Sequence, residues 1–451
     1  MSFSVFIKTF GCQMNEHDSE RMLWLLSERG YRMAHSEEHA DLILLNTCSV
    51  RYKAEHKVYS ALGVFAPLKE KNPNLIIAVG GCVAQQEKRR LLSRVRHLDL
   101  VFGPDQIDEL PDLVESVREG RSRLMAAEFK LGREFHLPTL LPETFALLPA
   151  GERPVTAFVA IMKGCDKFCT FCIVPFVRGR EKSRHPDEIV LEVRALVENG
   201  VKEVTLLGQT VNSYHYEGVS FSELLRRLDA ISGLERLRFV SPYPNDVSDD
   251  LINCMADLSS VCEQIHLPVQ SGSNRILEWM RRGYTREAYL EKILKLKKRN
   301  PDISISTDFI VGFPGESEED FEETLSLMDE VKYDSVFSFC YSSRPGTKAL
   351  RLGLEEVPGE IASERLERLQ ALQRDYTLEK YRALVGKEAE VLVEGRSKSD
   401  VSRWTGKTRS HIVVNFDATE GVNLKGALVN VKIEKALLSN IRGVYHPEVR
   451  S

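Results

Sequence analysis

Short apolar, β-rich runs alternate with helical patterns along the first 130 residues, and this alternation restricts the fold more than any other feature. Strands are predicted at 3–10, 42–45, 75–79 and 98–102, and helices at 16–30, 54–65, 83–94 and 107–119. Continuous apolar strands separated by helices are typical of a parallel sheet that is buried on both faces. We therefore predict an α/β domain with a doubly wound parallel sheet over residues 1–130.

A second run of alternating patterns follows residues 131–153, in which prolines recur without helical or strand periodicity. Such a stretch is typical of a linker between domains. Over residues 154–376, strands are predicted at 156–162, 203–207, 236–240, 264–267, 304–311 and 335–341, with helices between most of them. Six strands are too few for a closed eight-stranded barrel, so we predict a partial (βα)6 barrel.

The third segment, residues 377–446, has short β-rich runs separated by glycines, which predicts a small antiparallel β barrel. It carries twelve Lys and Arg against eight Asp and Glu, a charge of +4, within a chain of net charge −5. The remainder therefore carries −9, and the tail is the basic part. Basic side chains around an aromatic ring suit a folded RNA loop. We predict RNA contacts, rather than an ordinary exposed loop, for Arg396, Arg403, Trp404, Lys407 and Arg409.

Composition excludes several classes of protein. Of 451 residues, 43% are hydrophobic and 28% are charged, which excludes a largely disordered chain. The apolar run at 75–84 is too short to span a bilayer, and the first residues lack the pattern of a signal peptide. We expect a cytoplasmic protein that does not enter a membrane. In that compartment its nine cysteines stay reduced, so clustered cysteines are best interpreted as metal ligands or catalysts.

Three closely spaced cysteines, Cys165, Cys169 and Cys172, follow the first strand of the second domain. Three thiolates this close can hold three corners of an iron–sulfur cluster, which leaves the fourth iron free to bind a small molecule. Structural zinc is the competing interpretation, but it requires four ligands, and no fourth Cys or His lies near in the sequence. This spacing therefore predicts a cluster with one open iron.

Three more cysteines, Cys12, Cys48 and Cys82, each follow one of the first three predicted strands. Their separations are 36 and 34 residues, about one strand–helix–strand step each. Because ligand sites in an open parallel sheet lie outside the carboxyl ends of the strands, all three are expected at one edge. They predict a second cluster, and the alternative is three unrelated cysteines at strand ends. The remaining three, at 254, 262 and 340, are interpreted as core residues.

Several motifs together resemble the methylthiotransferases of the radical S-adenosylmethionine (SAM) superfamily, over nearly the whole chain. The motifs are KTFGCQMN (8–15), NTCSVR (46–51), GGCVAQQE (80–87), MKGCDKFCTFCIVPFVRGRE (162–181), LLGQTVNSY (206–214), HLPVQSGS (266–273), DFIVGFPGE (308–316), YSSRPGT (341–347) and GKTRSHIVVNF (406–416). The resemblance implies a C-terminal RNA-binding TRAM domain. One departure is Tyr243, where members of the family often carry histidine.

Within that family, Gln13, Met14 and Asn15 resemble the members that act on N6-isopentenyladenosine in tRNA. After this cysteine, members that act on threonylcarbamoyladenosine usually carry Lys-Val-Asn, and members that act on a ribosomal protein usually carry Pro-Lys-Asn. The resemblance implies methylthiolation of C2 of N6-isopentenyladenosine next to the anticodon (position 37), with one SAM as methyl donor and one as radical source. Methylthiolation of threonylcarbamoyladenosine is the close alternative. A non-catalytic iron–sulfur regulator that binds RNA is the alternative from another class, and the complete cysteine loop opposes it.

The resemblance also implies site residues and partners. It assigns Cys12, Cys48 and Cys82 to an auxiliary 4Fe–4S cluster, and Cys165, Cys169 and Cys172 to the radical SAM 4Fe–4S cluster. SAM contacts are expected from Gln209, Ser241, Gln270 and Ser271. Arg178 and Arg180, which follow the cluster loop, are expected to contact RNA phosphates or a cofactor carboxylate. His266 is interpreted as an interior histidine. The expected partners are tRNA carrying isopentenyladenosine, an electron donor such as flavodoxin or ferredoxin, and an iron–sulfur cluster assembly system.

Overall fold

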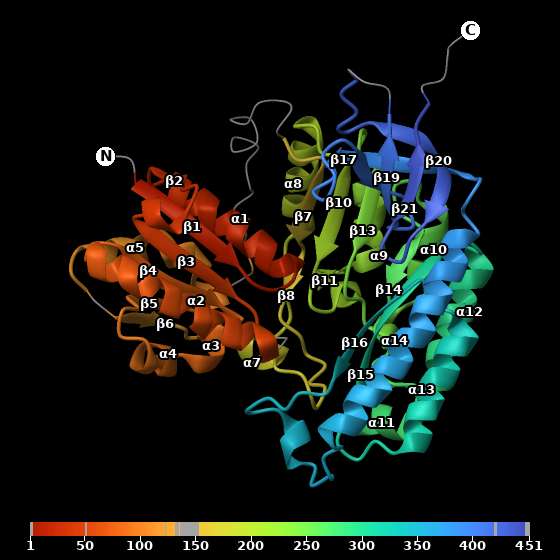
Figure 1. Ribbon diagram of the computed structural model, residues 1–451, viewed down its shortest axis with the longest axis horizontal. Coiled ribbons are helices and arrows are strands. Elements are labelled where there is room, and N and C mark those ends of the chain that lie inside the picture. Colours follow the sequence, from red (N-terminus) through yellow and green to blue (C-terminus); the bar gives the residue numbers. More distant parts are fainter. Residues whose placement is uncertain are drawn as a thin grey trace.

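The computed structural model describes residues 3–49, 52–121, 123–130, 135, 153–418 and 422–446, with the backbone alone at 52–56. Figure 1 shows an N-terminal α/β body at the left, a larger α/β body at the right and a small β barrel above the latter. Almost all of the predicted linker, residues 131–153, lies outside the described residues. No helix in the described ranges has the length and apolarity needed to cross a membrane.

The N-terminal body is built on a six-stranded sheet in the order β2-β1-β3-β4-β5-β6, and every pairing is parallel. This confirms the predicted parallel sheet. The strands are β1 (Phe3–Thr9), β2 (Tyr31–Met33), β3 (Leu42–Thr47), β4 (Ile76–Gly81), β5 (Leu100–Phe102) and β6 (Leu124–Ala126). The prediction missed the edge strands β2 and β6, because three residues are too few to show a periodicity.

Helices cover both faces of this sheet, as alternate residues of its central strands show. Ile43 and Leu45 of β3 pack in one apolar cluster, and Leu42 and Leu44 pack in another. The first cluster includes residues of α2 (Tyr52–Lys71), α3 (Cys82–Glu87) and α4 (Arg89–Arg94), and the second includes residues of α1 (Gln13–Ser27) and α5 (Leu110–Arg118). The helix predicted at 83–94 is two helices, because Lys88 between them has a φ of 49°.

The second body is a partial barrel of six parallel strands in two groups, β13-β10-β7 and β14-β15-β16. A single bridge between Leu237 and Val261 joins the groups. The strands are β7 (Thr156–Ala160), β10 (Glu203–Leu207), β13 (Arg236–Phe239), β14 (Gln264–His266), β15 (Ser304–Val311) and β16 (Ser335–Cys340). They lie within one or two residues of the predicted ends, which confirms the partial barrel.

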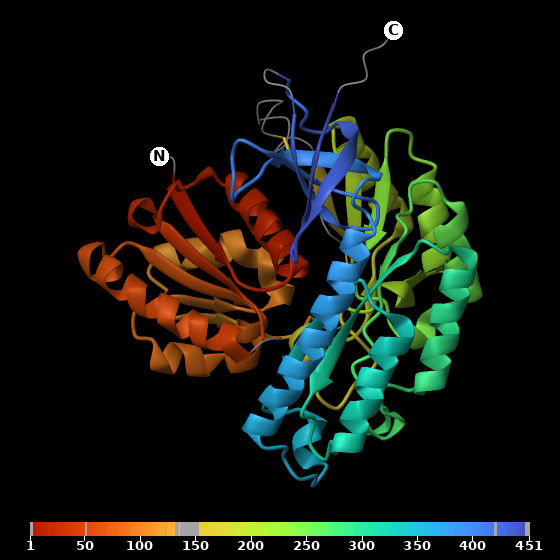
Figure 2. The same ribbon diagram turned by 45° about the vertical axis from the view of Figure 1, so that its right-hand side comes forward.

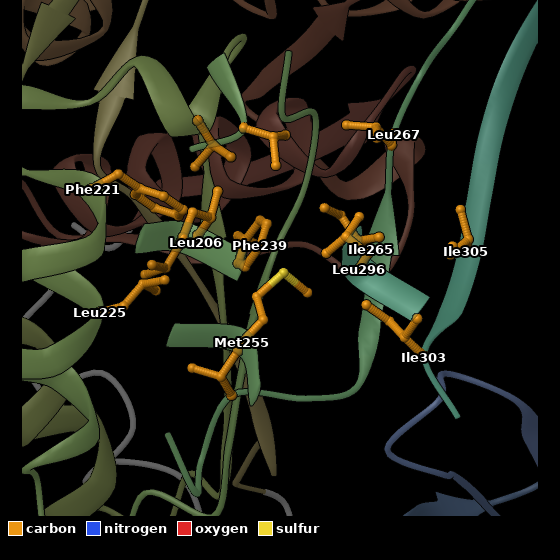
Figure 3. Close-up of a cluster of buried hydrophobic side chains, with 14 of the residues drawn as sticks. Leu206, Phe221, Leu225, Phe239, Met255, Ile265, Leu267, Leu296, Ile303 and Ile305 are labelled. Carbon is orange, nitrogen blue, oxygen red and sulfur yellow. The ribbon is translucent and has the colours of Figure 1, made fainter. Parts of the chain in front are cut away.

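Helices pack on the outside of the partial barrel and leave its interior to alternate strand residues. Figure 3 shows Leu206, Phe239, Ile265 and Ile305 among the side chains that fill the space between strands and helices. Since side chains alternate along a strand, the residues between these face the interior. The helices are α8 (Pro186–Glu198), α9 (Phe221–Asp229), α10 (Asp249–Asp257), α11 (Asn274–Trp279), α12 (Arg286–Arg299), α13 (Glu318–Val331) and α14 (Gly359–Arg382).

The C-terminal body is a closed barrel in the order β17-β18-β19-β21-β20. It comprises β17 (Glu388–Arg396), β18 (Trp404–Lys407), β19 (Val413–Asp417), β20 (Leu428–Ala436) and β21 (Ile441–Val444). The small β barrel is confirmed, but β19 and β21 pair in parallel while the other four pairings are antiparallel. In Figure 2, α14 rises from the second body to the base of this barrel.

Candidate cluster and substrate site

The loop with Cys165, Cys169 and Cys172 follows the first strands of the partial barrel and is fixed at its centre by Thr170. The Thr170 N–H donates to the Met280 carbonyl (3.1 Å), and its hydroxyl donates to the Trp279 carbonyl (2.8 Å). The Ala349 N–H donates to the Thr170 carbonyl (2.9 Å). Two distant segments therefore hold the loop in place, at the carboxyl ends of the strands.

Gly164 allows the loop to begin in this position. Its φ is +79°, and a Cβ there would come within 2.0 Å of the Arg180 carbonyl oxygen. Only glycine fits both the left-handed backbone and the close approach. The side-chain oxygen of Gln209, a predicted SAM contact, accepts from the Gly164 N–H.

The cysteines of this loop are buried, so their thiolate forms need a compensating positive charge. Burial raises the pKa of Cys165 to about 11 and that of Cys172 to about 12. Thiolates in such surroundings become favourable when a metal binds them, because the metal supplies positive charge. The three side chains therefore fit an iron–sulfur cluster better than they fit solvent-facing reactive cysteines.

Arg282, which sequence reasoning missed, lies against this loop. Its Nη1 donates to the Cys169 sulfur (3.3 Å), and its Nη2 donates to the Pro268 carbonyl (2.8 Å). The guanidinium is buried between the rings of Tyr243 and Tyr284, with centroids 4.7 and 5.3 Å away. The family departure at Tyr243 thus supplies one of the two rings. No local pattern in the sequence distinguishes Arg282 from Arg281 beside it.

The second triad is brought together at one edge of the N-terminal sheet, as its spacing predicts. Cys12 precedes α1, Cys48 follows β3, and Cys82 begins α3, so each lies at the carboxyl end of one of three neighbouring strands. Cys48 and Cys82 are buried, and Cys12 is exposed. A Cβ on Gly11, whose φ is +135°, would lie 2.6 Å from the Cys48 Cβ. Glycine at this position therefore lets the Cys12 turn approach Cys48.

The electrostatics of this triad favour one thiolate. A hydrogen bond with Cys48 and the positive charge of Arg178 lower the pKa of Cys12 to about 6 and outweigh the desolvation by neighbouring atoms, which acts in the opposite direction. Burial raises the pKa of Cys82. Within the described ranges, no three His, Cys, Asp or Glu side chains are arranged to hold a single metal ion. A cluster places a different demand on its ligands, because each thiolate binds a different iron atom.

Arg178 connects the two triads, and its predicted contact with RNA phosphate is wrong. It follows α7 (Val174–Val177), six residues after Cys172, and its guanidinium is buried. It pairs with Asp18 (2.7 Å) and donates to the Asn15 side chain (3.4 Å), both on α1. Cys82 packs against Ile173 and Val177 in the same place. The segment after one triad is therefore part of the wall of the other.

Two other predicted SAM contacts lie in unusual backbone conformations. Ser241 and Gln270 have φ values of 59° and 82°, which are uncommon for residues other than glycine. Such strain is frequent at ligand sites. The backbone of Gln270 bridges to β15, since its N–H donates to the Asp308 carbonyl and its carbonyl accepts from the Ile310 N–H, both at 2.9 Å. Ser271 differs, because its hydroxyl is buried and accepts from the Ser273 N–H (3.2 Å).

The structure separates the predicted RNA contacts into accessible and inaccessible residues. Trp404 is wrong as a stacking surface, because it is 6% exposed and lies in the core of the small barrel. Arg409 binds Glu263 (2.7 Å) and two backbone carbonyls of the partial barrel, so its guanidinium is engaged within the protein. Arg396 remains exposed, 4.0 Å from the Trp404 ring.

The other predicted RNA contacts are paired with acidic side chains. The ion pairs are Arg180–Asp166 (2.5 Å), Arg403–Asp417 (3.2 Å) and Lys407–Glu394 (2.9 Å). Arg180 is largely exposed, and Arg403 and Lys407 are half-buried. A phosphate would compete with the carboxylates at these positions.

Known families match three parts of the chain. Residues 4–103 match the uncharacterized protein family UPF0004, residues 159–328 match the radical SAM superfamily, and residues 382–443 match the TRAM domain. A tRNA-2-methylthio-N(6)-dimethylallyladenosine synthase of Syntrophus aciditrophicus is 47% identical, covering 97% of this chain and 94% of the relative. A protein of the same name from Geobacter metallireducens is 49% identical, covering 97% of each.

Solved structures share the fold at low sequence identity. A radical SAM methyltransferase, TsrM, from Kitasatospora setae aligns with a TM-score of 0.58 at 14% identity, covering 77% of this chain and 74% of its own. The cobalamin-dependent radical SAM enzyme OxsB aligns with a TM-score of 0.54 at 12% identity, covering 83% and 56%. These likenesses concern the fold alone.

Proposed function

The chain belongs to the family of the tRNA-2-methylthio-N(6)-dimethylallyladenosine synthases and is a radical SAM methylthiotransferase, and we propose that it methylthiolates C2 of N6-isopentenyladenosine next to the tRNA anticodon (position 37). The observation that carries this proposal is the contact between the two cysteine regions, because Ile173 and Val177, which follow one triad, pack against Cys82 of the other. Transfer of a methylthio group to an unactivated aromatic carbon needs both a radical source and a sulfur site, and the two triads supply a place for each.

In this proposal, Cys165, Cys169 and Cys172 hold the radical SAM cluster, and Cys12, Cys48 and Cys82 hold an auxiliary cluster. When bound, the first cluster would supply the electron that cleavage of SAM requires, and the second would supply the site for the sulfur that is transferred. The chain's own contribution is position and charge. Arg178, buried beside Cys12 and Cys82, offsets the negative charge of the thiolates and ties α1 to the cluster loop.

We place SAM at the carboxyl ends of the barrel strands, where Gln209, Ser241 and Gln270 follow β10, β13 and β14. Gln209 also fixes the start of the cluster loop through Gly164. Ser271 belongs to the support of this site, since its hydroxyl has protein partners. The TRAM domain and the names of the relatives support tRNA as the partner. An electron donor such as flavodoxin or ferredoxin, a cluster assembly system and a cytoplasmic location complete the proposal.

Nucleoside mass spectrometry of tRNA from cells that lack this protein tests the proposal. We expect the methylthiolated isopentenyladenosine to disappear and its precursor to accumulate. The wild-type gene and a Cys340→Ala control should restore the modification, because Cys340 belongs to neither triad and its sulfur donates to the Ala362 carbonyl of α14. Loss of methylthiolated threonylcarbamoyladenosine instead would overturn the assignment of the substrate.

A second experiment separates the roles of the two triads. A variant with Cys12, Cys48 and Cys82 all replaced by Ala should still cleave SAM to deoxyadenosine under anaerobic reduction with dithionite, because the other loop is intact. It should make no methylthiolated product. Methylthiolation by this variant would show that the N-terminal triad is structural.

A further inference from the structure

Phe337 presents an aromatic surface to the interior of the partial barrel. Its neighbours on β16 face the other way, because Ser338 accepts from the Gln370 side chain (3.4 Å) and Cys340 donates to the Ala362 carbonyl (3.5 Å), both on α14. Side chains alternate along a strand, so Phe337 faces the interior. Phe337 is nevertheless 50% exposed. The interior wall at this strand is therefore apolar and uncovered.

A polar pair lies beside this ring. The His266 ring meets Phe337 edge-on at 5.6 Å, and its two nitrogens contact the Ser306 hydroxyl (3.0 Å) and the Asp308 carboxylate (3.4 Å). The Asp308 side chain keeps 28% of its surface exposed. A carboxylate has about four acceptor positions, so its contact with His266 leaves capacity for another donor. His266, predicted to be an interior histidine, is partnered and 16% exposed beside this ring.

The opposite wall of the interior is closed. Phe158 of β7, Leu207 of β10 and Val240 after β13 pack with Met14 of α1 in a separate apolar cluster. Met14 lies two residues after Cys12, so the cover of this wall leads directly to the N-terminal triad. The exposed side chains Phe337 and Asp308 therefore lie on the other side of the interior, on β16 and β15.

We propose that Phe337, His266 and Asp308 form the site for the N6-substituted adenine, swung out of the tRNA loop, with Phe337 contacting the apolar isopentenyl group and ring. This inference rests on the proposed function and assigns the part of the chain that selects the substituent. An adenine must leave its stack for its C2 to reach a buried reaction centre. N6-isopentenyladenosine keeps one N6–H, which Asp308 accepts, and a flat apolar group, which an exposed phenyl ring suits.

The test compares two anticodon stem-loop RNAs, one with N6-isopentenyladenosine and one with adenosine, on the reconstituted holoenzyme with SAM under anaerobic conditions. Affinity is measured by fluorescence anisotropy, and kcat and KM by mass spectrometry. The Phe337→Ala variant should lose about 10- to 100-fold of its affinity for the isopentenylated RNA, which is the size of one aromatic stacking contact. It should lose less of its affinity for the adenosine RNA, because that RNA lacks the apolar group. Phe337→Tyr should restore most of this preference.

Asp308→Asn should lower the affinity for both RNAs by the same factor, because both carry an N6–H. Leu294→Ala on α12, an outward-facing residue that is 65% exposed, is the matched control and should bind as the wild type does. Cluster spectra and thermal unfolding show whether each variant is folded. If the wild type prefers the isopentenylated RNA and Phe337→Ala keeps the full preference, this inference is overturned. If the wild type itself shows no preference, the proposed function fails.

Discussion

The residue that most affects the radical SAM loop, after its cysteines, is Arg282. Its guanidinium donates to the Cys169 sulfur and is enclosed by two tyrosine rings. Hydrogen bonds to cluster sulfurs stabilise the reduced state, which carries more negative charge. We expect Arg282→Gln to lower the midpoint potential of this cluster by about 50 mV. One hydrogen bond contributes about 1 kcal/mol, and for a one-electron couple a tenfold change in the equilibrium constant for reduction corresponds to about 59 mV.

An electron paramagnetic resonance titration measures this potential. Arg281→Gln is the matched control, because Arg281 is the neighbouring residue and is exposed. Equal potentials in Arg282→Gln and the wild type would contradict the role assigned to Arg282.

A prediction on pH concerns Cys12 in the cluster-free protein. Its pKa is lowered to about 6, whereas that of Cys165 is raised to about 11. A lowered pKa means that the thiolate is present above pH 6, so alkylation at Cys12 should reach half its maximal rate near pH 6. Cys165 should stay protonated and slow up to pH 9. Peptide mapping after brief iodoacetamide treatment at pH 5–9 measures the alkylation rates of both cysteines. A midpoint near pH 9 in the rate profile of Cys12 would contradict the prediction.

Some of the site residues could be predicted from the sequence, and others could not. The cysteines could be predicted, because their chemistry depends on spacing and on strand ends. Arg178, Trp404 and Arg409 could not, because their surroundings come from distant segments. Arg409 is bound by Glu263, 146 residues away, and a basic run does not reveal which of its members face another domain. Arg282 had no signal of its own.

At the scale of elements, strands with long apolar runs were predictable to within a few residues, as β10 and β15 show. The prediction missed β2 and β6, because an edge strand of three residues carries little pattern. The break between α3 and α4 at Lys88 was also missed, because lysine rarely adopts a positive φ and nothing in the sequence indicates the value of 49° found here. Tertiary contacts, rather than local preference, decide such positions.

The loop between β8 (Met162–Lys163) and α7 offers a test at this scale, at Gly164. Gly164→Ala would place a Cβ 2.0 Å from the Arg180 carbonyl, so the cluster loop must shift. We expect this variant to lose the radical SAM cluster and to keep the auxiliary one, so that its iron content falls by about half. Gly200→Ala is the matched control, because Gly200 has a similar φ of +98° but nothing within 4 Å of its Cβ position. Equal iron content in the two variants would contradict the expectation.

At the scale of the whole molecule, three arginines attach the TRAM barrel to the amino ends of the partial-barrel strands: Arg236, Arg238 and Arg409. Arg236 donates to the Lys407 carbonyl (2.6 Å), and Arg238 donates to the carbonyls of Thr408 (2.8 Å) and Arg409 (2.7 Å). Arg236 and Arg238 are buried. The helix α14 also continues past the predicted boundary at residues 376 and 377 to Arg382. The TRAM barrel is therefore a fixed part of the molecule, at the end of the barrel away from the clusters.

This arrangement separates docking from RNA binding within one basic segment. Arg409→Ala removes the charge-assisted contacts with Glu263 and the carbonyls of Ser259 and Val261, so it should lower the free energy of unfolding by about 1–3 kcal/mol. The slope of log tRNA affinity against log salt should be the same in Arg409→Ala and in the wild type, because Arg409 neutralises no phosphate. Arg396→Ala, on the exposed side of the same barrel, should leave stability within about 0.5 kcal/mol and reduce the slope of log affinity against log salt by about one. Chemical denaturation and tRNA binding at several salt concentrations measure both variants. A reduced salt slope in Arg409→Ala, with unchanged stability, would show that this arginine contacts RNA and that the TRAM barrel is held to the partial barrel by other means.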